Sequence, residues 1–299
     1  MTTTAPLSRR PGWEARVGVI TVLTVGAALS AVVLFSLSSA KATKTQSTAT
    51  TIAGTRASSY PAGVVNPREP SGLAPPGPAA LKGYARSYVT DFGGTTLPAG
   101  WEIFTGVPGG DPGAHFGPRH VVVGHGLLQL NTWRDPAYNF GWVGGGLCQC
   151  GLSQTYGAYF VRSRITRAGP NASMLLWPKS NRWPPEIDFN ESGPVSTSTS
   201  WTVHYGAQDN IVQQTLYLDL TKWHTWGTIW TPTSITFTVD GLTWGAFTLT
   251  SAISNVPMTL DLQQRTFCTG KTGCPVQRQS MYVDWIAEYT HKLVTTPPQ

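Results

Sequence analysis

The sequence predicts an all-β protein, a sandwich of two antiparallel sheets that begins near residue 83. Short segments alternate apolar and polar side chains, as at 235–239, 258–263 and 281–289, and this period of two is typical of half-buried strands. Turns rich in glycine and proline separate them, and Asp240-Gly241 is a strong hairpin signal. No segment after residue 83 keeps the 3.6-residue period of a helix for three turns, so we expect strands throughout.

Four regions are expected along the 299 residues. Arg9, Arg10 and Arg16 precede residues 17–40, a run of 24 residues without charge. A secretory core is about 7–15 residues long and a membrane span needs about 20. We therefore expect residues 1–40 to be a signal peptide or signal anchor, with cleavage left open, and the chain to be exported to the cell envelope or the extracellular space.

Residues 41–82 are predicted to be a flexible linker, because 28 of the 40 residues from 41 to 80 are Thr, Ser, Ala, Pro or Gly. Residues 83–292 are expected to form the folded domain, and residues 293–299 a tail. We expect a monomer.

The positive charge lies outside the predicted domain. Residues 1–83 hold eight Lys or Arg and two Asp or Glu, whereas residues 84–299 hold thirteen of each. A nucleic-acid-binding domain needs a cationic face, so the neutral balance excludes that class of partner.

Three carboxylates lie close together in the segment WPPEIDFNE at 183–191. On a strand, Glu186 and Asp188 share a face, and Glu191 would point to the other one. One extra residue in a β-bulge would bring Glu191 back to their face. The sequence therefore predicts a bulged strand that presents three acids together.

Glycoside hydrolysis is the chemistry that such a face suits. It uses two carboxyl groups, one of which is a general acid and the other a nucleophile or base. Asp188, between the two glutamates, is expected to help separate their pKa values. Solvated acids on a surface strand are the alternative.

The segment resembles the signature of glycoside hydrolase family 16, in the bulged form of its laminarinase-like branch. Further segments follow the family's order over roughly 88–290: DF at 91–92, LPAGW at 97–101, GLLQL at 126–130, GGGL at 144–147, YGAYFVR at 156–162, WHTWGTIWTP at 223–232, VDG at 239–241 and VDW at 283–285. Pro185 stands where the family usually has glycine, and because proline cannot donate to a strand ladder we expect the strand to begin at Glu186.

The resemblance implies a concanavalin-like jelly roll with a substrate groove on its concave sheet. It implies Glu186 as nucleophile, Asp188 as assisting carboxylate and Glu191 as acid/base of a retaining endo-β-glycosidase. The polysaccharide substrate is expected to be a β-1,3-glucan. A cell-wall transglycosylase and a non-catalytic carbohydrate-binding module are the alternatives. Catalysis needs no cofactor, while a structural Ca²⁺ is expected in some members, and Asp284 matches a position sometimes used for it.

Five residues are candidates for substrate binding. Trp183 and Trp177 are expected as flat platforms for pyranose rings, and His204 as a polar group beside the acids. Arg162 is expected to pair with carboxylates of the groove, and Gln263 to bind sugar hydroxyls. For each, a core or solvated surface position is the alternative.

The four cysteines are Cys148, Cys150, Cys268 and Cys274. In an exported chain, disulfides are the default, with three connectivities open. Cys268–Cys274 is the preferred pair. A four-thiolate zinc site is the alternative, although neither spacing fits the usual zinc knuckles.

Overall fold

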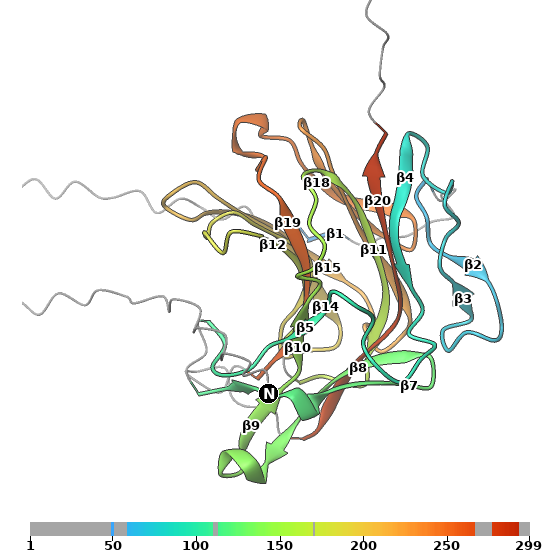
Figure 1. The fold of residues 1–299 in the computed structure, drawn as a ribbon. Coiled ribbons are helices and arrows are strands. Elements are labelled where there is room, and N and C mark those ends of the chain that lie inside the picture. Colours follow the sequence, from blue (N-terminus) through green and yellow to red (C-terminus); the bar gives the residue numbers. More distant parts are fainter. Residues whose placement is uncertain (1–48, 51–58, 110–112, 170, 267–276, 293–299) are drawn as a thin grey trace, which may run out of the picture. The chain divides into compact units, whose positions relative to one another are not determined.

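Two curved sheets stack on each other in the protein (Figure 1). The structure is a computed structural model that describes residues 49–50, 59–109, 113–169, 171–266 and 277–292. It confirms the predicted all-β class. Helix is confined, in these residues, to the short 3-10 turns η1 (Pro118–His120), η2 (Pro136–Tyr138) and η3 (Thr250–Ala252). The described part of the chain contains no helix long and apolar enough to cross a membrane.

The first sheet has eight strands. Their order across the sheet is β1 (Ala49–Thr50), β15 (Asn210–Tyr217), β14 (Ser198–Tyr205), β13 (Glu186–Ser192), β12 (Asn171–Pro178), β19 (Met258–Arg265), β10 (Gly146–Cys148) and β5 (Glu102–Ile103). The acids thus lie on a central strand, with β12 on one side and β14 on the other. A central strand is held by ladders on both edges, so its side chains are rigidly placed.

The second sheet has ten strands, eight of them on one path. Its order is β18 (Leu242–Phe247), β17 (Ile235–Val239), β16 (His224–Trp230), β11 (Gly157–Ile165), β20 (Gln279–His291), β8 (Leu127–Asp135), β9 (Gly141–Gly144) and β6 (His115–Phe116), with β4 (Tyr84–Thr90) on β20 and β7 (Val121–Gly124) on β8. The predicted hairpin at Asp240-Gly241 joins β17 to β18. Both residues have positive φ, 47° and 79°, as a type I′ turn requires.

The core lies between the two sheets. Every second residue of the facing strands is buried there, for example Ile187 and Phe189 of β13 and Leu260 and Leu262 of β19. Trp201 of β14 stacks on Phe237 of β17, with ring centroids 4.5 Å apart and an interplanar angle of 5°. Burial of such rings supplies much of the stabilisation of a sandwich.

A second apolar cluster covers the outer face of the ten-stranded sheet. It comprises Leu81, Ala158, Phe160, Ile229, Trp285, Ala287 and Tyr289. Residues 59–82 pack on this face and carry the short hairpin of β2 (Val64–Val65) and β3 (Leu73–Ala74), which lies outermost in Figure 1. We call residues 59–82 the strap.

The strap corrects the predicted linker, which was expected to extend to residue 82. Trp285 Nε1 donates to the Leu73 carbonyl at 2.8 Å, and the Tyr289 hydroxyl donates to the Gly77 carbonyl at 2.9 Å. Composition alone misses such a segment, because it binds through backbone carbonyls and a few apolar side chains. The N-terminal region, the tail, and most of residues 41–58 lie outside the described residues.

Candidate active site

The β-bulge predicted in the acid segment is present in β13. Asp188 lies opposite Thr202 and Glu191 opposite Ser200, so the register shifts by one residue between them. The ladder with β12 shifts as well, since Asp188 faces Leu175 whereas Asn190 faces Met174. Strand β13 begins at Glu186, directly after Pro185, as predicted.

The bulge places the three acids on one side of the sheet. Ile187 and Phe189 point into the core, and Asn190 also points inward, where its side chain contacts Met174 and Thr199. Glu186, Asp188 and Glu191 therefore point away from the core. We call this side of the eight-stranded sheet the acid face.

The Asp188 carboxyl is the most buried of the three acids, with a side-chain exposure of 2%. Burial raises its pKa well above the ordinary value, and the charges of Glu186 and Glu191 raise it further. A hydrogen bond with Glu186 acts in the same direction. Asp188 thus holds a proton over a wider pH range than an exposed aspartate does.

The pKa of Glu186 is raised above its ordinary value, although its neighbours act in both directions. Burial raises the pKa of its carboxyl, and so does the nearby Glu191 charge. His204 and the Trp183 indole lower that pKa, the latter through a 2.6 Å hydrogen bond from Nε1 to Glu186 Oε2. The indole donor therefore favours the ionised form of Glu186, which a nucleophile requires.

His204 joins Trp183 to the acids. It lies opposite Glu186 on the neighbouring strand, and its Nε2 is 3.6 Å from Asp188 Oδ2. Its Nδ1 is 2.8 Å from Asp209 Oδ1, and its ring lies 5.6 Å from the Trp183 ring. The structure thus places both Trp183 and His204 beside the acids.

Glu191 has a different environment. Its Oε1 is 3.5 Å from Arg265 Nη2 and also 3.5 Å from Asn171 Nδ2. Gln263 is on the same side of β19 as Arg265, since Gln264 between them points inward and donates to Gln279 of β20. It faces Ser173 of β12, which in turn faces Glu191. Gln263 therefore lies in the row of the sheet that contains Glu191.

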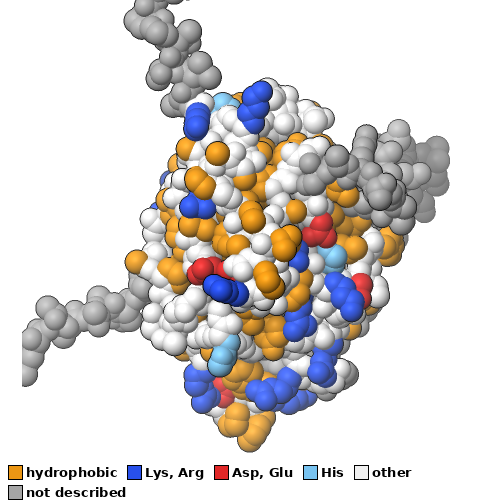
Figure 2. Space-filling model, turned by 90° about the vertical axis from the view of Figure 1, so that its right-hand side faces the viewer, with side chains coloured by type: hydrophobic (Ala, Val, Ile, Leu, Met, Phe, Trp, Pro, Cys, Tyr) orange, Lys and Arg blue, Asp and Glu red, His pale blue; other side chains and the backbone are white. Residues whose placement is uncertain are grey.

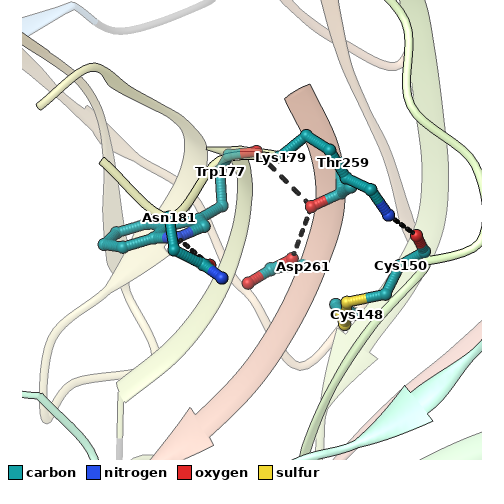
Figure 3. The surroundings of a disulfide bond; sticks show 7 residues. All are labelled: Cys148, Cys150, Trp177, Lys179, Asn181, Thr259 and Asp261. Atoms are coloured by element: carbon teal, nitrogen blue, oxygen red, sulfur yellow. Dashed lines mark hydrogen bonds between the residues drawn. A yellow bond between two sulfur atoms is a disulfide. The ribbon is translucent and has the colours of Figure 1, made fainter. Parts of the chain in front are cut away.

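Trp177 lies on the acid face of β12, because its neighbour Leu176 points into the core. Its Nε1 donates to Asn181 Oδ1 at 3.1 Å, and its carbonyl accepts a 3.4 Å bond from the Thr259 hydroxyl, which also lies 3.3 Å from Asp261 Oδ1 (Figure 3). The indole is thus held in one orientation on the same face as the acids.

A disulfide joins Cys148 and Cys150 at the β10 end of the row that runs from Asp188 through Leu175 and Asp261 (Figure 3). Cys148 lies opposite Asp261 in the ladder. Because two of the four thiols are joined, a zinc site made of all four cysteines is ruled out. The preferred Cys268–Cys274 pair lies outside the described residues.

Arg162 is the candidate that the structure contradicts. It belongs to β11 in the ten-stranded sheet, and its guanidinium donates to Ser71 Oγ at 3.1 Å and to Thr225 Oγ1 at 3.2 Å. Its carboxylate partner is Asp240, at 3.4 Å. Arg162 thus helps to fix the strap and does not pair with the acids of β13.

Asp284 does not fit a calcium ion. The ion takes about six to eight oxygen ligands, and this carboxylate is buried beside the Arg162 charge and accepts the Ser71 backbone N–H at 3.0 Å. Its Oδ1 has no hydrogen-bond partner among the described residues, but a single oxygen is not a ligand set.

Asn171 and Asp209 are residues of the site that the sequence analysis missed. Asn171 begins β12, and Asp209 lies in the turn before β15. Neither belongs to a motif, and only the pairing of the strands brings them to Glu191 and His204.

The sequence and the fold were compared with those of known proteins. The profile of the family described as "Glycosyl hydrolases family 16" matches residues 115–287. A search of curated proteins finds no match.

Several solved structures share the fold. The laminarinase catalytic domain of Thermotoga maritima MSB8 has a TM-score of 0.61 at 17% identity, covering 70% of this chain and 99% of that one. The endo-β-1,3-glucanase of Pyrococcus furiosus has a TM-score of 0.60 at 18% identity, covering 69% of this chain and 94% of that one. The laminarinase of Rhodothermus marinus has a TM-score of 0.60 at 20% identity, covering 69% of this chain and 97% of that one. These three structures confirm the jelly-roll fold. Because the family profile matches more than half of the sequence, the chain belongs to glycosyl hydrolase family 16 and is a glycoside hydrolase.

Proposed function

We propose that the protein is a retaining endo-β-glycosidase that hydrolyses a β-1,3-glucan by double displacement. The observation that carries the proposal is the bulge in β13, which puts Glu186, Asp188 and Glu191 on one face. The Glu191 charge is one of the influences that raise the pKa of Glu186, which supports a single site for both carboxyl groups, and a retaining enzyme needs two carboxyl groups at one site.

In the first step, Glu191 gives its proton to the glycosidic oxygen while Glu186 attacks the anomeric carbon. The bond to the leaving sugar breaks, and a glycosyl ester forms on Glu186. In the second step, Glu191 takes a proton from water, whose oxygen displaces Glu186. Glu191 thus loses one proton to the leaving sugar in the first step and gains one from water in the second, so it ends in its starting state.

The neighbours of the acids have separate tasks in this scheme. Asp188, whose pKa is raised, keeps its proton and hydrogen-bonds Glu186 without adding a third negative charge. The Trp183 indole orients Glu186 through its hydrogen bond to Oε2, and the Arg265 guanidinium, 3.5 Å from Glu191 Oε1, helps to orient that carboxyl.

The proposed substrate follows from the relatives and from the aromatic side chains. Similar structures are described as laminarinases or endo-β-1,3-glucanases. Trp183 and Trp177 lie on the acid face with their indole N–H groups already bonded, so their ring faces suit the apolar C–H faces of pyranose units. Gln263 and His204 are proposed to bind sugar hydroxyls.

The sizes of products released from a panel of β-glucans and galactans test the substrate, and proton NMR of the first product tests retention. Glu186→Gln is expected to abolish turnover and keep glucan binding. Glu191→Gln is expected to spare substrates with good leaving groups. The exposed Glu102 offers a matched control, since Glu102→Gln is expected to keep full activity. Near wild-type turnover of Glu186→Gln, or initial release of the α-anomer, would refute the mechanism.

The same panel separates the alternatives. Longer products in the presence of an added sugar acceptor would indicate a transglycosylase. Glucan binding without any new reducing ends would indicate a binding module.

We also propose that the chain is exported, either cleaved after its N-terminal segment or anchored in the membrane by residues 17–40. The Cys148–Cys150 disulfide supports an oxidising compartment. Fractionation of the producing cells, with N-terminal sequencing of the recovered protein, tests export and cleavage together. Recovery of the full chain in the cytosol with both thiols reduced would contradict it.

A further inference from the structure

A pocket of about 310 Å³ lies on the outer face of the ten-stranded sheet. Its lining includes Asn131 and Trp133 of β8 and Ser280 and Tyr282 of β20. Leu130 and Met281, next to these residues in the two strands, point into the core. The side chains of these four residues therefore point away from the core, on the opposite side of the sandwich from the acid face.

The pocket is cationic. Among its eight lining residues are Arg167 and Arg278, and none is Asp or Glu. Figure 2, which views the molecule from the right-hand side of Figure 1, shows several Lys and Arg side chains gathered on the lower part of this side. An anion entering the pocket meets two guanidinium groups and no carboxylate of the lining.

Local contacts hold both arginines in place. The Arg278 guanidinium lies 5.1 Å from the centroid of the Trp133 ring, within the range of a cation–π contact. Arg167 Nη1 donates to Gln277 Oε1 at 2.6 Å. Because their positions are already restricted, less side-chain entropy is lost when they bind a ligand.

Neutral polar groups share the pocket with the arginines. The Ser280 hydroxyl donates to Asn131 Oδ1 at 2.6 Å, and Thr166 Oγ1 accepts the Ser280 backbone N–H at 3.0 Å. The Thr166 hydroxyl can still donate its own hydrogen. Hydroxyl and amide groups beside arginines suit a ligand that carries both hydroxyls and a negative charge.

We propose that this pocket binds a saccharide unit bearing a sulfate ester or a carboxylate. The volume exceeds what a bare oxyanion needs, since a water occupies about 30 Å³ of liquid, and the polar lining matches sugar hydroxyls. This inference rests on the proposed function, because a polysaccharide that reaches the acid face also reaches the opposite side of the same domain. The pocket holds an acidic glycan while the acid face cleaves a chain.

Calorimetric titration tests the proposal with three probes: a β-linked tetrasaccharide, the same compound with sulfate esters, and one with uronic acid units. The sulfated or the uronic probe is expected to bind at least tenfold more tightly than the neutral one, and the stronger of the two identifies the anionic group. Arg167→Ala and Arg278→Ala are each expected to weaken that binding about tenfold, and the double variant more, because each removes charge-assisted hydrogen bonds to the anionic group.

Lys82→Ala is the matched control, because it also removes one exposed positive charge but lies outside the pocket lining. It is expected to keep the affinity. Equal affinity for all three probes, or an unchanged affinity in the double variant, would overturn the proposal. So would inorganic sulfate binding as tightly as the sulfated saccharide, since that would indicate an anion site only.

Hydrolysis of a short neutral glucan is measured on the same variants. It is expected to stay at the wild-type rate, because neither arginine lies on the acid face. If the wild type itself does not hydrolyse any glucan, the proposed function is wrong. The binding experiment still tests independently whether the pocket binds an acidic saccharide.

Discussion

Glu288 of β20 is a buried acid that the proposed chemistry does not use. It lies opposite Tyr159 in the ladder, is 1% exposed, and its Oε1 has no hydrogen-bond partner among the described residues. Burial raises its pKa from 4.5 to about 8. The folded protein therefore holds this proton at neutral pH, whereas the unfolded chain releases it above about pH 4.5.

The sign of the pH dependence follows from proton binding. Between the two pKa values the folded state holds more protons than the unfolded state, so stability falls as the pH rises and the loss is complete above pH 8. At about 1.4 kcal/mol per pKa unit, the part of this loss between pH 6 and pH 9 is about 3 kcal/mol.

Glu288→Gln replaces the protonated acid with a neutral side chain of the same shape. Urea unfolding at pH 6, 7, 8 and 9 is expected to show the wild type losing about 3 kcal/mol more than this variant across the range. Glu102→Gln, on an exposed residue of β5, is the control and is expected to follow the wild type. Parallel curves for the wild type and Glu288→Gln would refute the argument.

Three further perturbations test other parts of the structure. Trp183→Phe removes the indole donor that lowers the pKa of Glu186, so the acidic limb of the kcat/KM profile is expected to move to higher pH; an unmoved limb would contradict the role. Trp201→Ala removes the ring stacked on Phe237 and is expected to cost about 3–5 kcal/mol in urea unfolding, with a loss below 1 kcal/mol as the contrary outcome. Deleting residues 1–58 removes the two-residue edge strand β1 and is expected to lower the melting temperature only slightly. Deleting residues 1–82 also uncovers the outer apolar cluster and is expected to cause a much larger loss of melting temperature or solubility; equal behaviour of the two forms would show that the strap contributes nothing.

The alternation of side chains within a single strand was enough to predict some features of the site. The position of Glu191 relative to Glu186 follows from parity alone, so the bulge was predictable, and so was the start of β13 after Pro185. Arg162 shows the limit of this reasoning. Alternation indicates that its side chain is on the opposite face of the strand from Val161, but only the pairing of β11 with β16 and β20 shows which sheet holds the strand.

The strap and the partner of His204 were missed for a related reason. The strap has no hydrophobic period, and two of the hydrogen bonds that hold it come from aromatic side chains more than 200 positions away, in β20. Asp209 reaches His204 because the turn between β14 and β15 brings it back to the ring. Composition and periodicity describe a segment by itself, and these contacts exist only between segments.

The irregularity in β13 also constrains how its sequence can vary. An inserted residue changes the sidedness of everything that follows it, so the five-position interval from Glu186 to Glu191 cannot become four by gradual substitution. A deletion would have to change the register of the ladders with both β12 and β14 at the same time, since both ladders shift at this point. Loops at the ends of these strands can lengthen or shorten freely, while the interval between the two glutamates is locked by its neighbours on either edge.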